Sequence, residues 1–240
     1  MQNQIQTELN LVADRITSGG AYIGAVRGSA RRTLIIAAVL VSAVASGWPL
    51  ACSTRDRVIL AGFWFEAVSY DSTEAMVGPL GGPLTVADLR TIEEVARSEI
   101  VRVFAPLRIT FIADRRATYR VRVVQDLRNL RAPWAPGPAA ESRSVPGLGG
   151  EGAVSFRMIV SNAVAYAEAA DRPAIITAIG KGIERAAIHE FAHQLLGTAA
   201  LHSPDRASYE YESAARREQY YGELHWDVAW PVLQRRVGLR

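Results

Sequence analysis

A histidine, a glutamate and a second histidine lie close together in residues 188–197, with the spacing His-Glu-x-x-His. His189 and His193 are four residues apart, so on a helix their Cβ atoms lie on one face, roughly 5–6 Å apart, and both rings can reach one metal ion. Glu190 follows about 100° round the helix, where its carboxylate can reach a water at the metal without binding the metal itself. The spacing therefore predicts a zinc-hydrolase site with His189 and His193 as ligands and Glu190 as general base.

The alternative is that His189 and His193 are two ordinary histidines on a half-buried helix. The chain has 4 histidines, and all of them lie in its last quarter. They are His189, His193, His202 and His225. Histidines that only fill a core would not gather in this way, so the clustering favours the metal site.

The residues around the motif predict the helix that has to carry it. Apolar side chains recur at intervals of three and four residues and form a stripe on a different face from the two histidines. The stripe consists of Ile183, Ala187, Ile188, Phe191, Ala192 and Leu195. Pro173 is typical of a helix start and Gly197 of a helix end, so we expect one face of this helix to pack and the other to face the chemistry.

The metal needs a third ligand from outside this helix, because a tetrahedral catalytic zinc normally has three protein ligands and a water. The sequence contains one cysteine, Cys52, which excludes a cysteine-rich zinc site. The best candidate is His202 in the segment His202-Ser203-Pro204-Asp205, since a chain that leaves the helix at Gly197 can turn back to the metal. His225, beside Trp226, is expected to have a structural role instead.

The composition is that of a globular protein. With 240 residues, 49% of them hydrophobic and 21% charged, the chain is long enough for one substantial domain and a targeting segment. The formal net charge of +3 comes from arginines that are dispersed along the chain rather than grouped. This dispersion argues against a nucleic-acid partner.

Residues 1–52 predict an export signal. Arg31 and Arg32 precede the apolar run 33–45, which ends in the small-x-small cleavage pattern Ala43-Val44-Ala45. We therefore expect an extracytoplasmic protein, secreted or periplasmic, with its catalytic domain in residues 53–240.

Cys52 suggests a second interpretation of the same region. Leu50-Ala51-Cys52 resembles the end of a bacterial lipobox, although Pro49 stands where that motif prefers leucine, and lipidation of Cys52 would anchor the protein. A third option is an uncleaved anchor in residues 34–51, close to the roughly 18–20 residues needed to span a bilayer. Contact with a membrane is expected only through this region.

Residues 57–240 predict an alternation of strands and helices. We expect strands at 58–65, 107–113, 119–124 and 153–160, the last at a sheet edge, and helices at 85–105 and 161–173. Residues 131–152 contain many prolines and glycines, which favours an irregular loop within one domain.

The motif and its surroundings resemble the metzincin metallopeptidases, and their matrixin-like branch most closely. That family carries HExxHxxGxxH followed by Ser-x-Asp, a turn containing methionine beneath the metal, and a C-terminal helix. His189, Glu190 and His193 match outright, residues 202–205 match the third-ligand segment, and residues 226–238 are similar to the closing helix. The resemblance implies an α+β fold in which a mixed twisted sheet packs on a long helix and on the HExxH helix, with a small irregular C-terminal subdomain that ends in a helix.

Two departures from the family pattern bear on the metal site. The glycine is one position late and His202 three positions late, and Ser208-Tyr209-Glu210-Tyr211 stands where the methionine turn should be. Glu210 replaces the methionine, and because gluzincin peptidases take a glutamate as third ligand, Glu210 is the alternative to His202. Glu212 is a weaker candidate of the same kind, and Tyr211 is the tyrosine best placed to stabilise an oxyanion.

The sequence thus predicts an exported endopeptidase that uses Zn²⁺ to hydrolyse protein or peptide substrates, with Glu190 as general base. A gluzincin-type peptidase with Glu210 as ligand is one alternative. Another is a catalytically silent exported protein that keeps zinc for stability. The remaining one is a surface lipoprotein in which the motif is accidental.

Overall fold

A computed structural model of the chain describes residues 58–66, 79–128, 137–145, 148–197 and 201–240. The predicted export signal lies outside the described residues, and so does Cys52, the candidate for lipidation. Within the described ranges, no helix combines the length and the apolar character needed to cross a bilayer.

The fold is α+β and contains a mixed five-stranded sheet. Its strands, in chain order, are β1 (Ile59–Phe65), β2 (Ile109–Ile112), β3 (Tyr119–Val124), β4 (Ala140–Val145) and β5 (Gly149–Ser155). They are arranged in the order β2-β1-β3-β5-β4. Every neighbouring pair is parallel except β4 and β5, which form an antiparallel pair, so β4 is the antiparallel edge of the sheet.

Helix α3 (Val86–Phe104) is the long amphipathic helix that the sequence predicts. Its first turn is closed by a capping box, in which the Thr85 hydroxyl accepts from the Asp88 backbone N–H and the Asp88 carboxylate accepts from that of Thr85. The helix ends two residues before Pro106, as expected from the missing N–H of proline.

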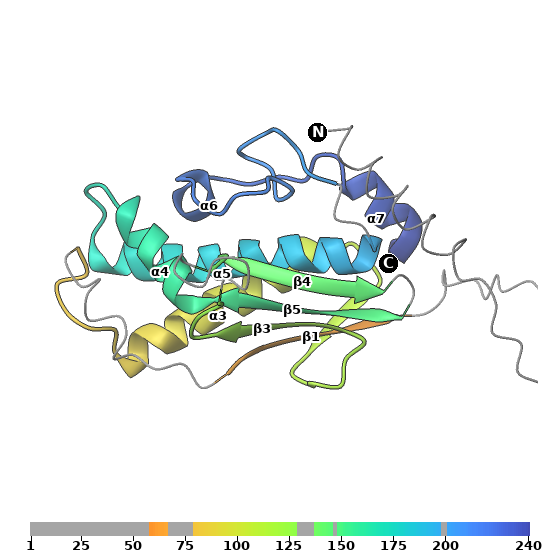
Figure 1. Ribbon diagram of the computed structural model, residues 1–240, viewed down its shortest axis with the longest axis horizontal. Helices are drawn as coiled ribbons and strands as arrows, with labels where there is room; N and C mark the ends of the chain where they lie inside the picture. The colour runs from red at the N-terminus through yellow and green to blue at the C-terminus, as the bar shows by residue number, and fades with distance from the viewer. Residues whose placement is uncertain (1–57, 67–78, 129–136, 146–147, 198–200) are drawn as a thin grey trace, which may run out of the picture. The chain divides into compact units, whose positions relative to one another are not determined.

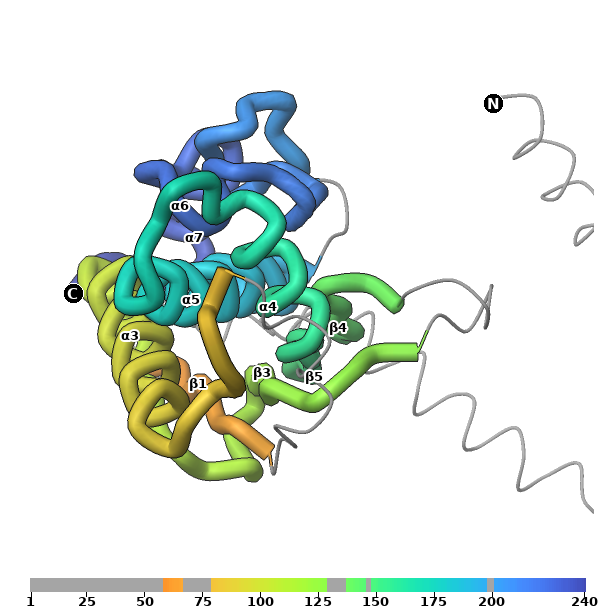
Figure 2. The backbone as a smooth tube through the Cα atoms, turned by 90° about the vertical axis from the view of Figure 1, so that its left-hand side faces the viewer, coloured from red at the N-terminus to blue at the C-terminus, as the bar shows by residue number. Residues whose placement is uncertain are grey.

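Helix α5 (Arg172–Leu196) carries the histidine motif and lies at the centre of the fold. It contacts α3, strands β3, β4 and β5, and three further helices, α4 (Phe156–Ala165), α6 (Glu218–Tyr221) and α7 (Trp230–Val237). Figure 1 shows α5 between the sheet and the C-terminal segment, and Figure 2 shows α3 and α5 side by side on one side of the sheet. Neighbouring elements cover α5 nearly all round. The prediction that only one face of this helix packs is therefore wrong.

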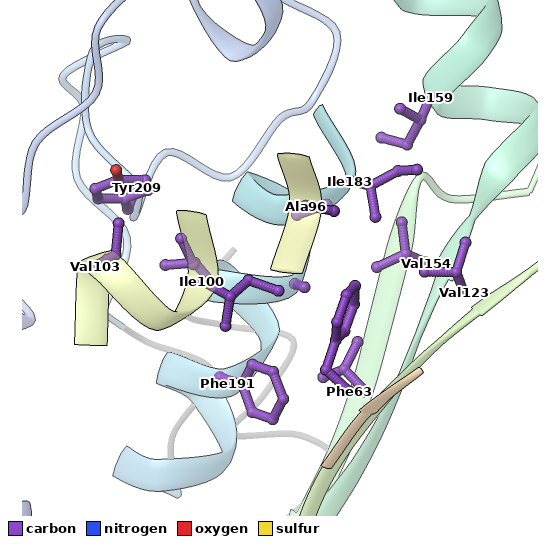
Figure 3. Packing of buried hydrophobic residues seen from close by; sticks show 14 of the residues in the cluster. Phe63, Ala96, Ile100, Val103, Val123, Val154, Ile159, Ile183, Phe191 and Tyr209 are labelled. Atoms are coloured by element: carbon purple, nitrogen blue, oxygen red, sulfur yellow. The ribbon is translucent and has the colours of Figure 1, made fainter. Parts of the chain in front are cut away.

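The apolar core lies between the sheet, α3 and α5. Phe63 of β1 and Val154 of β5 face Ile183 and Phe191 of α5, and Ile100 of α3 fills the space beside them (Figure 3). All five side chains are almost completely buried. Burial of each such side chain contributes about 1.5–3 kcal/mol, so the position of α5 against the sheet is strongly determined.

The structure corrects the predictions for residues 131–165. The expected loop 131–152 contains β4 and the start of β5, and the expected edge strand 153–160 is wrong on two counts. β5 ends at Ser155 and lies inside the sheet, and the chain enters α4 at Phe156, where the Ser155 hydroxyl accepts from the Met158 N–H. The helix expected at 161–173 is likewise divided between the end of α4 and the first residues of α5.

Replacing Gly180 by alanine is expected to destabilise the contact between α5 and α3. A Cβ atom there would lie 2.7 Å from the Val95 Cβ and 3.0 Å from the Ile92 carbonyl oxygen. The gain in helix propensity is at most about 1 kcal/mol, whereas overpacking against a β-branched side chain and backbone costs about 1–3 kcal/mol. We expect a net loss of about 1–2 kcal/mol in the free energy of unfolding, measured by urea denaturation. Gly82→Ala, where a Cβ meets nothing within 4 Å, serves as control, and an equal effect of both changes would contradict the packing argument.

Candidate metal centre

The ends of α5 are determined by local sequence. Asp171 caps its N-terminus by accepting from the Ala174 N–H, and Pro173 follows in the first turn. Gly197 ends the helix in the left-handed conformation, with φ 62°, and its N–H donates to the His193 carbonyl. These boundaries place His189 and His193 in the last two turns, as the motif requires.

Three imidazoles converge at this end of α5. The Nε2 atoms of His189 and His193 are 2.9 Å apart, and that of His202 lies 3.2 Å from that of His193. Zn–N bonds of about 2.0–2.1 Å in a tetrahedral site place ligand nitrogens about 3.3 Å apart. The three histidines form a group that could hold a metal ion, with all their candidate ligand atoms within 4.8 Å of one another.

The orientation of the His189 ring is set by a backbone carbonyl. Its Nδ1–H donates to the backbone carbonyl oxygen of Tyr209 at 2.9 Å. In the neutral imidazole the proton is therefore on Nδ1 and the lone pair is on Nε2. Since Nε2 is the atom that faces His193, the hydrogen bond at Nδ1 prepares the ring to bind a cation.

The His189 ring is also held in its neutral form. Burial lowers its pKa to about 4, and the positive charge of a protonated His193 acts in the same direction. A neutral ring is the form that binds metals, so His189 is available as a ligand throughout the neutral pH range.

Glu190 is a buried carboxyl, 6% exposed. Burial raises the pKa of Glu190 to about 7. A hydrogen bond with Ser142 of β4 lowers this pKa, and the charge of the nearby Glu141 raises it further. A carboxyl that titrates near neutral pH is suited to accept and return a proton.

A cavity of about 560 Å³ opens beside these groups. His189, Glu190 and His202 line it, together with the residues just before and at the start of β4 and with Tyr211. Binding pockets for small molecules are roughly 300–1,000 Å³, so the cavity has room for a substrate group next to the candidate metal centre.

The carboxylate of Glu210 is engaged in hydrogen bonds within the C-terminal segment. It is 2% exposed and accepts from the backbone N–H groups of Asp227 and Ala229 and from the Ser208 hydroxyl. Within the part of the chain that the structure describes, His189, His193 and His202 are the residues brought close enough to share one ion. The placement therefore favours His202 over Glu210 as third ligand.

The remaining candidates lie around the centre. Glu212 is exposed, with its carboxylate 3.8 Å from the Nδ1 of His202. Tyr211 packs its ring against the Arg216 guanidinium, 4.7 Å away. His225 is exposed and lies 3.0 Å from the Asp205 carboxylate, and its structural role stays a prediction.

Gln194 is a positioning residue that sequence reasoning missed. It is 1% exposed, and its amide pairs with the backbone of Arg120 in β3, with both hydrogen bonds at 3.1 Å. A Cβ on Gly150 or Gly152 of β5 would lie within 3 Å of Gln194. Two glycines at alternate positions of a strand indicate such a close approach, but in the sequence both fall within the stretch whose prolines and glycines favour a loop.

Glu184 and Arg185 are two further charged residues buried on α5, 1% and 5% exposed. The Arg185 guanidinium donates to the carbonyls of Glu218, Gln219 and Gly222 around α6. Its Nε lies 3.7 Å from the Glu184 carboxylate. Arg185 thus connects the motif helix to the C-terminal segment.

Burial raises the pKa of Glu184 from its ordinary 4.5 to about 8. The charged and titratable groups that face it are Arg185, Lys181, Glu99, Arg102 and Tyr209. Because the folded protein holds this proton at pH values where the unfolded chain has lost it, the contribution to stability is full below pH 4.5 and is lost as pH rises through 8.

We expect Glu184→Gln to remove this pH dependence. Relative to the variant, the free energy of unfolding of the metal-free wild type should fall between pH 5 and pH 8 by at most about 1.4 kcal/mol per pH unit. Urea denaturation across this range measures the difference, and shared titrations such as that of Glu190 cancel in it. Parallel pH profiles for the two proteins would contradict the assignment.

No protein-family model matches the chain, and a search of curated proteins finds no match.

Proposed function

We propose that this protein is a zinc-dependent endopeptidase of the metzincin type. The observation that carries the proposal is the convergence of His189, His193 and His202 beside the buried carboxyl of Glu190. The cavity next to them supports the same function, because a hydrolase needs space for its substrate at the reacting groups.

The proposed chemistry assigns one task to each residue. The three histidines hold zinc, which when bound lowers the pKa of a water to about 7 and polarises the scissile carbonyl. Glu190 takes a proton from the attacking water and transfers it to the leaving amine, for which its pKa of about 7 is suited. Tyr211 is a residue of the cavity wall, and its hydroxyl is proposed to donate to the oxyanion that develops on the substrate carbonyl.

The arrangement of elements supports the metzincin assignment beyond the motif. A long helix α3 and the motif helix α5 pack on a mixed sheet with one antiparallel edge strand. Residues 201–240 contain two short helices and end with α7, as the resemblance implies for the C-terminal subdomain. Export is proposed from residues 1–52 alone.

Metal analysis combined with peptide cleavage tests this function. We expect the purified protein to contain one zinc per chain and to cut members of a mixed peptide library, detected by mass spectrometry. A zinc chelator should abolish cleavage, and added Zn²⁺ should restore it. A folded protein that binds no zinc would overturn the proposal. Zinc binding without cleavage of any peptide would indicate the silent, zinc-stabilised protein instead.

A further inference from the structure

The segment Ser208–Tyr211 passes beside the three histidines and is held by a buried carboxylate. Glu210 Oε1 accepts from the N–H of Asp227 at 3.0 Å and from that of Ala229 at 2.8 Å. Glu210 Oε2 accepts from the Ser208 hydroxyl, which in turn accepts from the Glu210 N–H. Oε2 also accepts from the Asp227 N–H at 3.2 Å, so both carboxylate oxygens hold backbone N–H groups.

One consequence of these contacts reaches His189. Tyr209, next to Glu210, supplies the carbonyl that accepts from His189 Nδ1, and the Tyr209 N–H donates to the His225 carbonyl. The position of this carbonyl depends on how residues 208–211 lie against residues 225–229. The Glu210 carboxylate bridges these two stretches of chain.

A second consequence reaches His202. The backbone N–H of Ser203 donates to the Glu210 carbonyl at 3.2 Å. The Ser203 hydroxyl donates to the Asp227 carboxylate, and the Asp227 N–H donates back to the Glu210 carboxylate. Hydrogen bonds thus close a ring through Ser203, Asp227 and Glu210, and the residue preceding this ring is His202.

We propose that Glu210 is a positioning residue of the metal centre, which holds the Tyr209 carbonyl against His189 and His202 against the other two rings. The inference rests on the proposed function, since it assumes that the histidines bind zinc. A methionine could not perform this task in the same way, because a thioether sulfur is only a weak acceptor. A carboxyl group has two oxygen acceptors, which can serve the backbone N–H groups and the Ser208 hydroxyl at the same time.

The zinc affinity of full-length variants shows whether Glu210 acts through its hydrogen bonds or only by filling space. Glu210→Met keeps the length of the side chain but removes the acceptors, and we expect it to weaken zinc binding by about 10–100-fold. Glu210→Gln keeps one acceptor oxygen for Asp227 and Ala229, and we expect it to recover most of the affinity. Glu223→Gln, which changes an exposed glutamate of the same segment, should bind as tightly as the wild type.

The measurement is competition against a chromophoric chelator, at a temperature where circular dichroism shows each metal-free protein to be folded. Absorption spectra of the Co²⁺-loaded proteins provide a second readout, because a displaced ligand changes the ligand field. We expect an altered spectrum for Glu210→Met and an unaltered one for Glu223→Gln.

Wild-type affinity in Glu210→Met would overturn the inference while leaving the peptidase proposal intact, whereas a wild type that binds no zinc would overturn both. If Glu210→Met does not fold, Ser203→Ala decides. It removes the hydroxyl that joins the His202 segment to Asp227, and we expect it to weaken zinc binding by about tenfold. Unchanged affinity in that variant would also overturn the inference.

Discussion

Replacing Glu190 by glutamine is expected to lower kcat/KM for peptide hydrolysis by about 10²–10⁴-fold, the usual contribution of a general base, while zinc stays bound. Glutamine has nearly the same shape and can keep the contact with Ser142 of β4, but it cannot accept a proton from water. Glu190 does not belong to the group of three candidate metal ligands. Replacing its carboxylate should therefore leave the metal affinity within a few-fold of the wild type.

Steady-state kinetics and metal content of the same preparation check this expectation. Glu94→Gln makes the same chemical change at an exposed position of α3 and should leave both quantities unchanged. If the Glu190 variant hydrolyses peptides as fast as the wild type, Glu190 is not the base.

Replacing His202 by alanine is expected to have the largest effect on metal binding. Without His202, only His189 and His193 remain as ligands, both from one helix. Mutation of residues that contact a ligand, but not the metal, lowers metal affinity by up to roughly 100-fold. We expect the loss of a ligand itself to lower zinc affinity by more than this. Hydrolysis should fall with it. The fold should persist, because the His202 side chain is about a third exposed and lies outside the apolar core.

His225→Ala is the matched control, since it removes the other histidine of the C-terminal segment, which is exposed and pairs with Asp205. Isothermal calorimetry with Zn²⁺ compares the two variants. Near-wild-type affinity in His202→Ala would show that another group completes the site. Glu210→Ala would then be measured, because Glu210 is the ligand of the gluzincin alternative.

The features that could be predicted from the sequence are those encoded over a few residues. Pro173 and Gly197 mark the start and end of α5, and the interval between His189 and His193 places both rings on one face. Thr85 and Asp88 mark the start of α3 in the same way. These signals act within one turn of helix, so they hold whatever surrounds them.

The β4–β5 hairpin could not be predicted in the same way, because its strands are defined by partners. The residues of β4 alternate between partly buried and exposed, with none fully buried, and Gly150 and Gly152 of β5 weaken any local preference for a strand. Pairing with β3 and the close approach of Gln194 determine the structure. Neither is visible in the segment itself.

The candidate site shows the same division. His189, Glu190 and His193 follow from helical spacing, whereas the role of Glu210 depends on backbone N–H groups 17 and 19 residues further along the chain. In the sequence, Glu210 is unusual because it stands where the metzincin peptidases that the chain resembles carry a methionine. Only the tertiary structure distinguishes a ligand from a residue that holds the backbone.

The distribution of the three histidines has a mechanical consequence. Two are on α5, which is anchored in the apolar core, and the third is on residues 201–240, which contain only short helices among their described elements. An ion bound to all three is a cross-link between these two stretches, comparable in effect to a disulfide, which the single cysteine of the sequence cannot form within the chain. Such an ion would therefore hold the cavity wall that carries Tyr211 against the motif helix, and its removal would loosen that contact.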